Sequence, residues 1–151
     1  MNRIVKNVTV NISRKNAFQK FINELNKWWP NEYTWSQDDL MDISIDPRIN
    51  GLCTEIGPNN FRCDWGTVTE IEEFKQLTFK WQISPTRSPV PDSKKASTVK
   101  LLFHSISDCE TNLELEHKDF ENHGDNWNEY MQSMDSKLGW SYILRCYADY
   151  V

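Results

Sequence analysis

Residues 77–83 read LTFKWQI, and this stretch alternates strictly between apolar and polar side chains. Its odd-numbered members are large and apolar, whereas its even-numbered members are threonine, lysine and glutamine. Alternation with a period of two is the pattern of a β-strand with one buried face. The same period predicts further strands at 3–12, 43–45, 52–56, 61–71, 98–106 and 110–117. We therefore expect a curved antiparallel sheet of about six or seven strands, five of which follow one another as a meander.

Two other stretches show helical periodicity. After Ser13, a suitable helix cap, apolar residues recur at steps of three and four over residues 17–25, and Pro30 then ends the segment. Near the C-terminus, apolar stripes predict a long helix that is bent or interrupted at residues 135–139. The order of strand, helix, meander and helix indicates an α+β fold in which the sheet closes on the C-terminal helix.

Composition and charge limit the class of protein. The chain has 151 residues, with 17 Lys and Arg against 22 Asp and Glu, and thus a formal net charge of −5. This length suits a single domain, residues 1–151, and the acidic balance without a basic block argues against a nucleic-acid partner. No apolar run of 18 residues and no signal-peptide pattern occur, so we expect a cytoplasmic protein without a membrane partner.

Motifs for metal, cofactor and catalysis are missing from the sequence. The chain has four cysteines, at positions 53, 63, 109 and 146. They form no Cys-x-x-Cys pair, so we expect reduced thiols and no metal site. No phosphate-binding, dinucleotide or nucleophile motif occurs, and we expect no cofactor.

Of the three histidines, His117 alone falls on an apolar face. It is either a candidate general acid or base or a hydrogen-bonded core histidine. We expect His104 and His123 to be solvated.

Side-chain parity indicates which residues face the C-terminal helix. Within 61–71 the odd-numbered side chains are the expected inward set, and the inward faces of the other strands are rich in aromatic rings. These rings either fill the interior or line a pocket, in which His117, Tyr130, Arg48 or Glu55 would supply hydrogen bonds. The expected ligand-binding residues are Trp65, Phe79, Trp81, Phe103, Leu115, His117, Trp127, Tyr130, Met131 and Met134.

Several separated motifs resemble one known family. They are the Gly51 turn, Glu55, the Trp65-Gly66-x-Val68 step, Leu77-x-Phe79-x-Trp81, Thr111-x-Leu113-x-Leu115-x-His117 and Gly139-Trp140-x-x-Ile143-Leu144. This pattern is similar to the activator-of-heat-shock-ATPase homologue (AHSA-like) branch of the START-related SRPBCC superfamily. The resemblance implies a helix-grip fold, in which an antiparallel sheet wraps around the C-terminal helix and encloses a cavity for hydrophobic small molecules.

The residues and the resemblance together leave three functions to weigh. The leading one is binding of a hydrophobic or aromatic small molecule between the sheet and the C-terminal helix. The second is co-chaperone-type activation of a heat-shock-protein ATPase, with the chaperone as partner, although the sequence shows no exposed apolar stripe. The third is a polyketide cyclase-like reaction in the same cavity with His117 as acid or base. Ligand binding without catalysis is the expectation, because a shared fold does not establish a shared activity.

Overall fold

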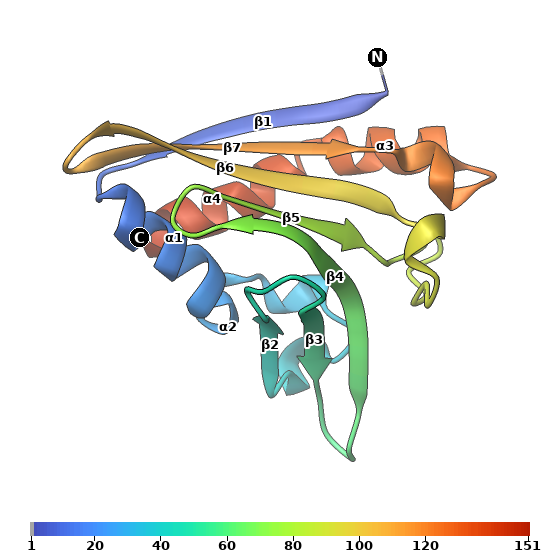
Figure 1. The fold of residues 1–151 in the computed structure, drawn as a ribbon. Helices are drawn as coiled ribbons and strands as arrows, with labels where there is room; N and C mark the ends of the chain where they lie inside the picture. The colour runs from blue at the N-terminus through green and yellow to red at the C-terminus, as the bar shows by residue number, and fades with distance from the viewer. Residues whose placement is uncertain (1) are drawn as a thin grey trace.

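The computed structural model describes residues 2–151, and its main feature is one curled antiparallel sheet with helices on its inner side (Figure 1). The strands lie in the order β1-β7-β6-β5-β4-β3-β2, so the first strand of the chain pairs with the last. Their bounds are β1 Arg3–Val10, β2 Asp42–Ile45, β3 Leu52–Ile56, β4 Arg62–Glu72, β5 Gln76–Trp81, β6 Ser97–Ser107 and β7 Glu110–Lys118. The predicted α+β helix-grip fold is confirmed.

Apart from η3, which lies in the connection between β5 and β6, the helices form one group before the meander and one group after it. Their bounds are α1 Arg14–Asn23, α2 Leu25–Trp28, α3 Trp127–Asp135 and α4 Trp140–Tyr150, with 3₁₀ helices η1 Asn31–Tyr33, η2 Gln37–Asp39, η3 Ser93–Lys95 and η4 Phe120–His123. The Ser13 hydroxyl caps α1 as predicted, because it accepts a hydrogen bond from the Asn16 amide at 3.2 Å. Among residues 2–151, no helix combines the length and the apolar character that crossing a bilayer requires.

The predicted interruption of the C-terminal helix is confirmed between α3 and α4. The chain turns so tightly there that a Cβ atom on Gly139 would lie 2.0 Å from the carbonyl oxygen of Met134. Only glycine allows this approach without a shift of the backbone. The break therefore depends on one residue, and it leaves an irregular segment between the two helices.

The side-chain parity predicted for β4 is only partly right. Trp65 points inward as expected, but Phe61 is exposed, Val68 is fully buried, and Thr67 and Thr69 lie outside the core. The pairing register of β4 shifts once against β3 and once against β5. Each such bulge adds an unpaired residue and turns the following side chains to the opposite face. A strict period of two cannot anticipate these shifts.

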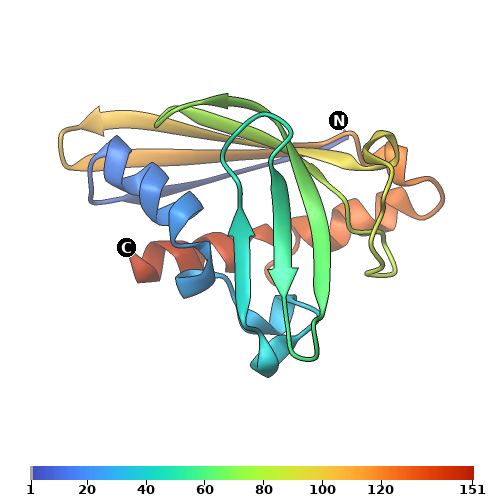
Figure 2. The ribbon, with the colours of Figure 1, turned by 60° about the horizontal axis from the view of Figure 1, so that its bottom comes forward.

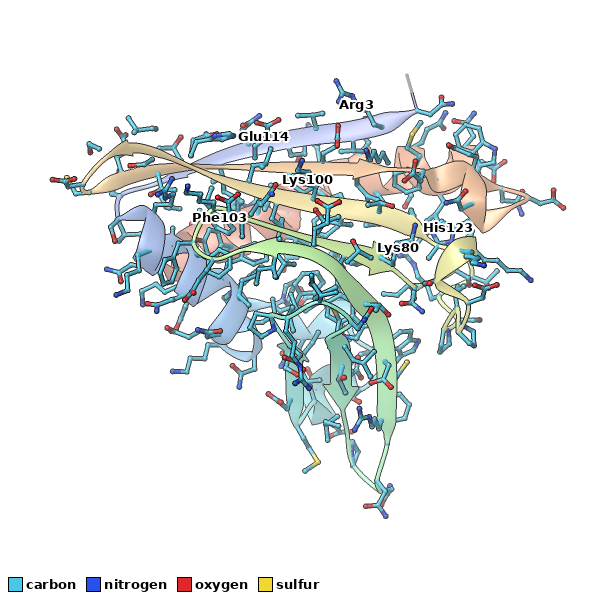
Figure 3. The ribbon with its side chains drawn as sticks, in the orientation of Figure 1. Arg3, Lys80, Lys100, Phe103, Glu114 and His123 are labelled. Carbon is cyan, nitrogen blue, oxygen red and sulfur yellow. The ribbon has the colours of Figure 1, made fainter. Side chains whose placement is uncertain are left out.

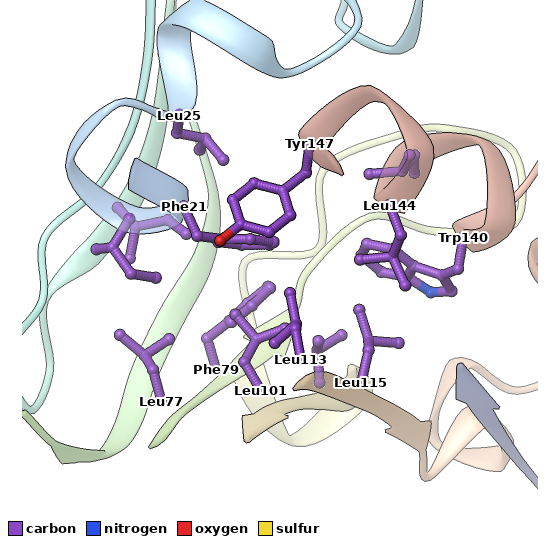
Figure 4. Packing of buried hydrophobic residues seen from close by; sticks show 14 of the residues in the cluster. Phe21, Leu25, Leu77, Phe79, Leu101, Leu113, Leu115, Trp140, Leu144 and Tyr147 are labelled. Atoms are coloured by element: carbon purple, nitrogen blue, oxygen red, sulfur yellow. The ribbon is translucent and has the colours of Figure 1, made fainter. Parts of the chain in front are cut away.

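The interior beneath the C-terminal half of α4 is solid (Figure 4). Phe21 of α1 packs against Tyr147 of α4 with ring centroids 4.9 Å apart, and against Phe103 of β6 at 6.1 Å. The Tyr147 hydroxyl, buried in this cluster, donates a hydrogen bond of 2.7 Å to the Ala17 carbonyl oxygen. Helices α1 and α4 are thus fixed to each other and to the sheet at this end.

The four cysteines are free thiols. Cys53 and Cys63 lie on the neighbouring strands β3 and β4, but they are paired with Gly66 and Glu55 and not with each other. Within residues 2–151, no three His, Cys, Asp or Glu side chains gather in a way that could hold a metal ion.

Candidate functional site

An open cleft of about 530 Å³ lies where the end of β5 meets the break between α3 and α4. Three stretches of chain surround it, at residues 29–37, 81–87 and 133–143. Figure 2 shows the strands β2, β3 and β4 in front of the two C-terminal helices, with η1 and η2 beside the lower end of these strands. The volume falls within the range of ordinary small-molecule sites.

Two tryptophans form the inner wall of the cleft. Trp29 and Trp81 are almost fully buried, and their ring centroids lie 6.4 Å apart. Trp65 packs behind them, stacked on Trp29 at 6.0 Å. The Trp81 indole donates to the Tyr130 hydroxyl at 2.7 Å, which in turn donates to the Ile83 carbonyl oxygen at 2.7 Å. The wall is therefore held in place by both packing and hydrogen bonds.

A buried carboxylate positions one rim of the cleft. Glu55 of β3 is only 1 % exposed, and it accepts hydrogen bonds from the backbone amides of Trp35 at 3.1 Å and Ser36 at 2.8 Å. The Trp35 indole then donates to the carbonyl oxygen of Arg87 at 2.8 Å. Glu55 itself does not line the cleft, but it fixes the backbone of Trp35 and Ser36 at the cleft rim. The bond from Trp35 to Arg87 then connects the two segments at the entrance, residues 29–37 and 81–87.

Two opposite charges face the cleft, Glu32 and Arg87. The Tyr142 hydroxyl donates to Glu32 Oε2 at 2.6 Å, and this bond holds the pKa of Glu32 below its usual value, so the carboxylate is charged at neutral pH. The Arg87 guanidinium lies over the ring of Tyr130, 5.3 Å from its centroid. Tyr33 stands close to both charges, and burial first and Glu32 second raise its pKa.

The structure brings only part of the predicted site to the cleft. Trp81 and Met134 line it. Trp65, Phe79, Phe103, Leu115, His117 and Tyr130 are buried in the interior, and Trp127 and Met131 are half-buried on α3 away from the cleft. Arg48 lies elsewhere, in a shallow hollow on β2 and β3, where it pairs with Asp46.

Sequence reasoning missed most of the cleft because many of its residues lie in short 3₁₀ helices and loops. Trp29, Glu32, Tyr33 and Trp35 belong to the segment WWPNEYTW at residues 28–35, which has no strand or helix period. The density of aromatic residues in an otherwise polar connection is the signal that could have found them. Arg87 carried no comparable signal, since it stands in a proline- and serine-rich loop.

His117 is fully buried behind the cleft wall, and its ring lies 5.7 Å from that of Trp81. The Trp140 indole donates to His117 Nδ1 at 2.9 Å, so the neutral ring carries its proton on Nε2 and donates it to the Ser97 hydroxyl at 2.7 Å. The Ser97 hydroxyl then donates to Nε2 of His123 at 2.8 Å. Both nitrogens of His117 are thus occupied by protein groups.

Burial keeps both of these histidines neutral. It lowers the pKa of His117 well below its usual value and, together with the charge of Lys80, lowers that of His123 to about 4. Lys80 and His123 lie at the same end of the sheet (Figure 3).

The expectation that His123 is solvated is wrong, because its ring is half-buried and bonded to Ser97. His104 is exposed as expected, 3.1 Å from Glu114.

The chain is similar to one protein family over most of its length. Residues 18–150 match the sequence profile of the family described as Activator of Hsp90 ATPase homolog 1-like protein, which confirms the resemblance seen in the motifs. The chain matches no curated protein.

Solved structures with the same fold include a synthase, an Aha1 protein and a resistance protein. One is the anthrahydroquino-γ-pyrone synthase Txn09 complexed with SUM, with a TM-score of 0.70, 22% identity, and coverage of 100% of this chain and 97% of that chain. Another is the Aha1 dimer from Colwellia psychrerythraea, with a TM-score of 0.65, 17% identity, and coverage of 99% and 95%. The third is the self-sacrificing resistance protein CalC from Micromonospora echinospora, with a TM-score of 0.65, 19% identity, and coverage of 99% and 93%. At such identities the similarity concerns the fold alone.

Proposed function

We propose that this chain, which belongs to the Activator of Hsp90 ATPase homolog 1-like family, binds an aromatic or otherwise hydrophobic small molecule in the cleft beside the α3–α4 break. The observation that carries the proposal is the meeting of four aromatic side chains around one open cavity: Trp29, Tyr33, Trp35 and Trp81. Aromatic rings at favourable distances add about 0.5–1.5 kcal/mol per pair beyond the burial of apolar area. A flat aromatic ligand would gain such contacts on several sides.

The state of the polar groups around the cleft supports this assignment. The Trp81 indole and the Tyr130 hydroxyl already satisfy each other, so the inner wall offers a ligand mainly apolar surface. The charged groups stand at the entrance, on Glu32 and Arg87. An apolar cavity with a few polar groups at its edge is typical of ligand sites. The synthase that shares the fold is complexed with SUM, which is consistent with a bound ligand in this architecture.

The geometry of the cleft favours neither of the two other functions. A cyclase-like reaction through His117 would need a free ring nitrogen at the cavity, and both of its nitrogens are bonded within the protein. Activation of a chaperone ATPase would need a docking surface. The large exposed apolar residues are divided among three parts of the molecule: the outer strands with Val5 and Ile106, the β2–β4 region with Met41, Ile49, Leu52 and Phe61, and the cleft itself with Tyr33 and Leu138.

Titration with 2-naphthamide, a neutral aromatic probe, tests the proposal by the change in tryptophan fluorescence. In the variant Ser133→Phe a large ring enters the cleft, because Ser133 lines it, and the affinity should fall at least about tenfold, or 1.4 kcal/mol. The variant Gln132→Phe places the same ring on an exposed neighbour outside the cleft and should bind the probe normally. The proposal fails if the wild-type protein binds neither this probe nor larger neutral aromatic compounds, or if Ser133→Phe binds as well as Gln132→Phe.

A further inference from the structure

The loop that carries Arg87 is held in an unusual conformation. Arg87 has a φ of 64°, in the left-handed region that side chains other than glycine seldom adopt. Its amide donates to the Ser84 carbonyl oxygen at 2.9 Å, and its own carbonyl oxygen accepts the bond from the Trp35 indole. The Ser84 hydroxyl accepts two further bonds, from the amides of Thr86 and Ser88. The turn is fixed from both sides, and it carries the Arg87 side chain to the cleft.

The Arg87 guanidinium has no acidic partner within the described chain. Among residues 2–151, no carboxylate lies within 4.0 Å of it, and its close contacts are the Tyr130 ring and Met134 Sδ at 3.9 Å. The ring contact orients the guanidinium, and apart from a weak hydrogen bond from Nη1 to Met134 Sδ it leaves the N–H edge available. That planar edge has the geometry that binds a carboxylate through two parallel hydrogen bonds.

The charges around the cleft also differ from one side to the other. Arg87 is the only cation among the lining residues, and Glu32 is the only anion. The Glu32 carboxylate is already engaged by Tyr142 and stays charged at neutral pH. An anionic group on a ligand would be repelled near Glu32 and attracted near Arg87, so the pair sets both the charge and the orientation of a bound molecule.

We infer that the cleft prefers an aromatic molecule that carries a carboxylate group, with the carboxylate on Arg87 and the rings between Trp35 and the wall of Trp29 and Trp81. This inference rests on the proposed function and goes beyond it by naming the chemical class of the ligand. The ligand class follows from one cation without an acidic partner at the entrance and aromatic walls inside, in a chain whose overall charge is negative. The local cation decides the preference, because distant exposed charges are screened by salt.

The test compares two probes of nearly the same shape, 2-naphthoate and 2-naphthamide, by titration with calorimetry or tryptophan fluorescence. The wild-type protein should bind 2-naphthoate about tenfold more tightly than 2-naphthamide, and higher salt should narrow this difference. In Arg87→Gln the preference should disappear while the affinity for 2-naphthamide stays within about twofold. Arg87→Lys should keep part of the preference, because lysine retains the charge and loses the planar fork.

Lys94→Gln is the matched control, since it removes one positive charge from an exposed residue of the same loop that does not line the cleft, and it should keep the full preference. Equal binding of the two probes to the wild-type protein would overturn the inference and leave the proposed function standing. A preference that survives in Arg87→Gln, or that is lost equally in Lys94→Gln, would also overturn it. Failure of both probes to bind would overturn the proposed function and the inference with it.

Discussion

The two ends of the space between the sheet and the C-terminal helices are built from similar residues and end up differently. At one end Phe21, Phe103 and Tyr147 pack into a solid interior. At the other end Trp29 and Trp81 form the wall of an open cleft. Both ends are aromatic and both wall faces are buried, so aromatic content does not decide whether the space is filled.

The difference lies in what covers each end. Helix α1 lies across the solid end, and its bond from Tyr147 to the Ala17 carbonyl oxygen fixes it to α4. The open end is covered by the short 3₁₀ helices and loops at residues 29–37 and 81–87, next to the break in the helix layer at Gly139. A regular helix places a side chain into the interior at every turn. The segments over the cleft instead bond to each other, as the Trp35 indole does to the Arg87 carbonyl oxygen. The cover, more than the sheet, creates the cleft.

Truncation of one aromatic residue at each end provides the largest contrast. Phe21→Ala should lower the free energy of unfolding by about 3–5 kcal/mol, because it leaves a cavity among packed rings. Tyr33→Ala at the cleft should cost roughly 1–2 kcal/mol, since Tyr33 is partly exposed and loses its hydrogen bond to the Leu138 carbonyl oxygen and its ring contact with Tyr142. Urea unfolding of both variants measures the two values. Equal costs would mean that the cleft end is as tightly packed as the solid end.

Replacement of the glycine at the helix break should harm stability and binding together. Gly139→Ala forces the Met134 carbonyl oxygen to move and should cost about 1–3 kcal/mol through overpacking. The same shift moves residues 133–139, which line the cleft, so binding of 2-naphthamide should weaken in parallel. Lys137→Ala, an exposed position in the same segment, serves as the control for both unfolding and titration. An unchanged affinity in Gly139→Ala would show that the break does not shape the cleft.

Removal of the Glu55 charge should loosen the entrance of the cleft. In Glu55→Gln one of the two amides of Trp35 and Ser36 would face an NH₂ group instead of an oxygen, at a cost of about 1–2 kcal/mol. Hydrogen exchange should then be faster in residues 34–37 and unchanged in α1. Glu70→Gln, on an exposed part of β4, is the matched control and should have neither effect. Protection of residues 34–37 as in the wild type would contradict the positioning role of Glu55.

The dependence of stability on pH tests whether His117, behind the cleft wall, is excluded from water. A histidine whose pKa is lower in the folded than in the unfolded chain takes up its proton on unfolding, so stability falls as the pH drops below about 6.5. We expect the free energy of unfolding to fall by up to about 1.4 kcal/mol per pH unit because of His117. Half-buried His123 should add a smaller decrease, which extends down to about pH 4. Urea unfolding between pH 7.5 and 5 measures the slope. His117→Gln should flatten it and the exposed His104→Gln should not; a flat wild-type profile would mean that His117 is hydrated.

The sequence predicts the sheet and its buried faces better than the cleft. The alternation in residues 77–83 correctly places Phe79 and Trp81 inside, and parity correctly buries His117. The bulges of β4 and the bonding of His117 to Trp140 depend on contacts between distant segments, which periodicity does not encode. The cleft is further from prediction still, because irregular loops create it and a conformation such as that of Arg87 depends on its partners.

The most direct test of this account is a map of backbone amide chemical shifts as 2-naphthamide is added to the ¹⁵N-labelled protein. We predict shifts concentrated at residues 29–37, 81–87 and 133–143, the three stretches around the cleft, with α1 and its contact to Tyr147 unchanged. Shifts centred instead on Phe21, Phe103 and Tyr147 would contradict it, because they would place the binding space at the end that the structure shows to be filled.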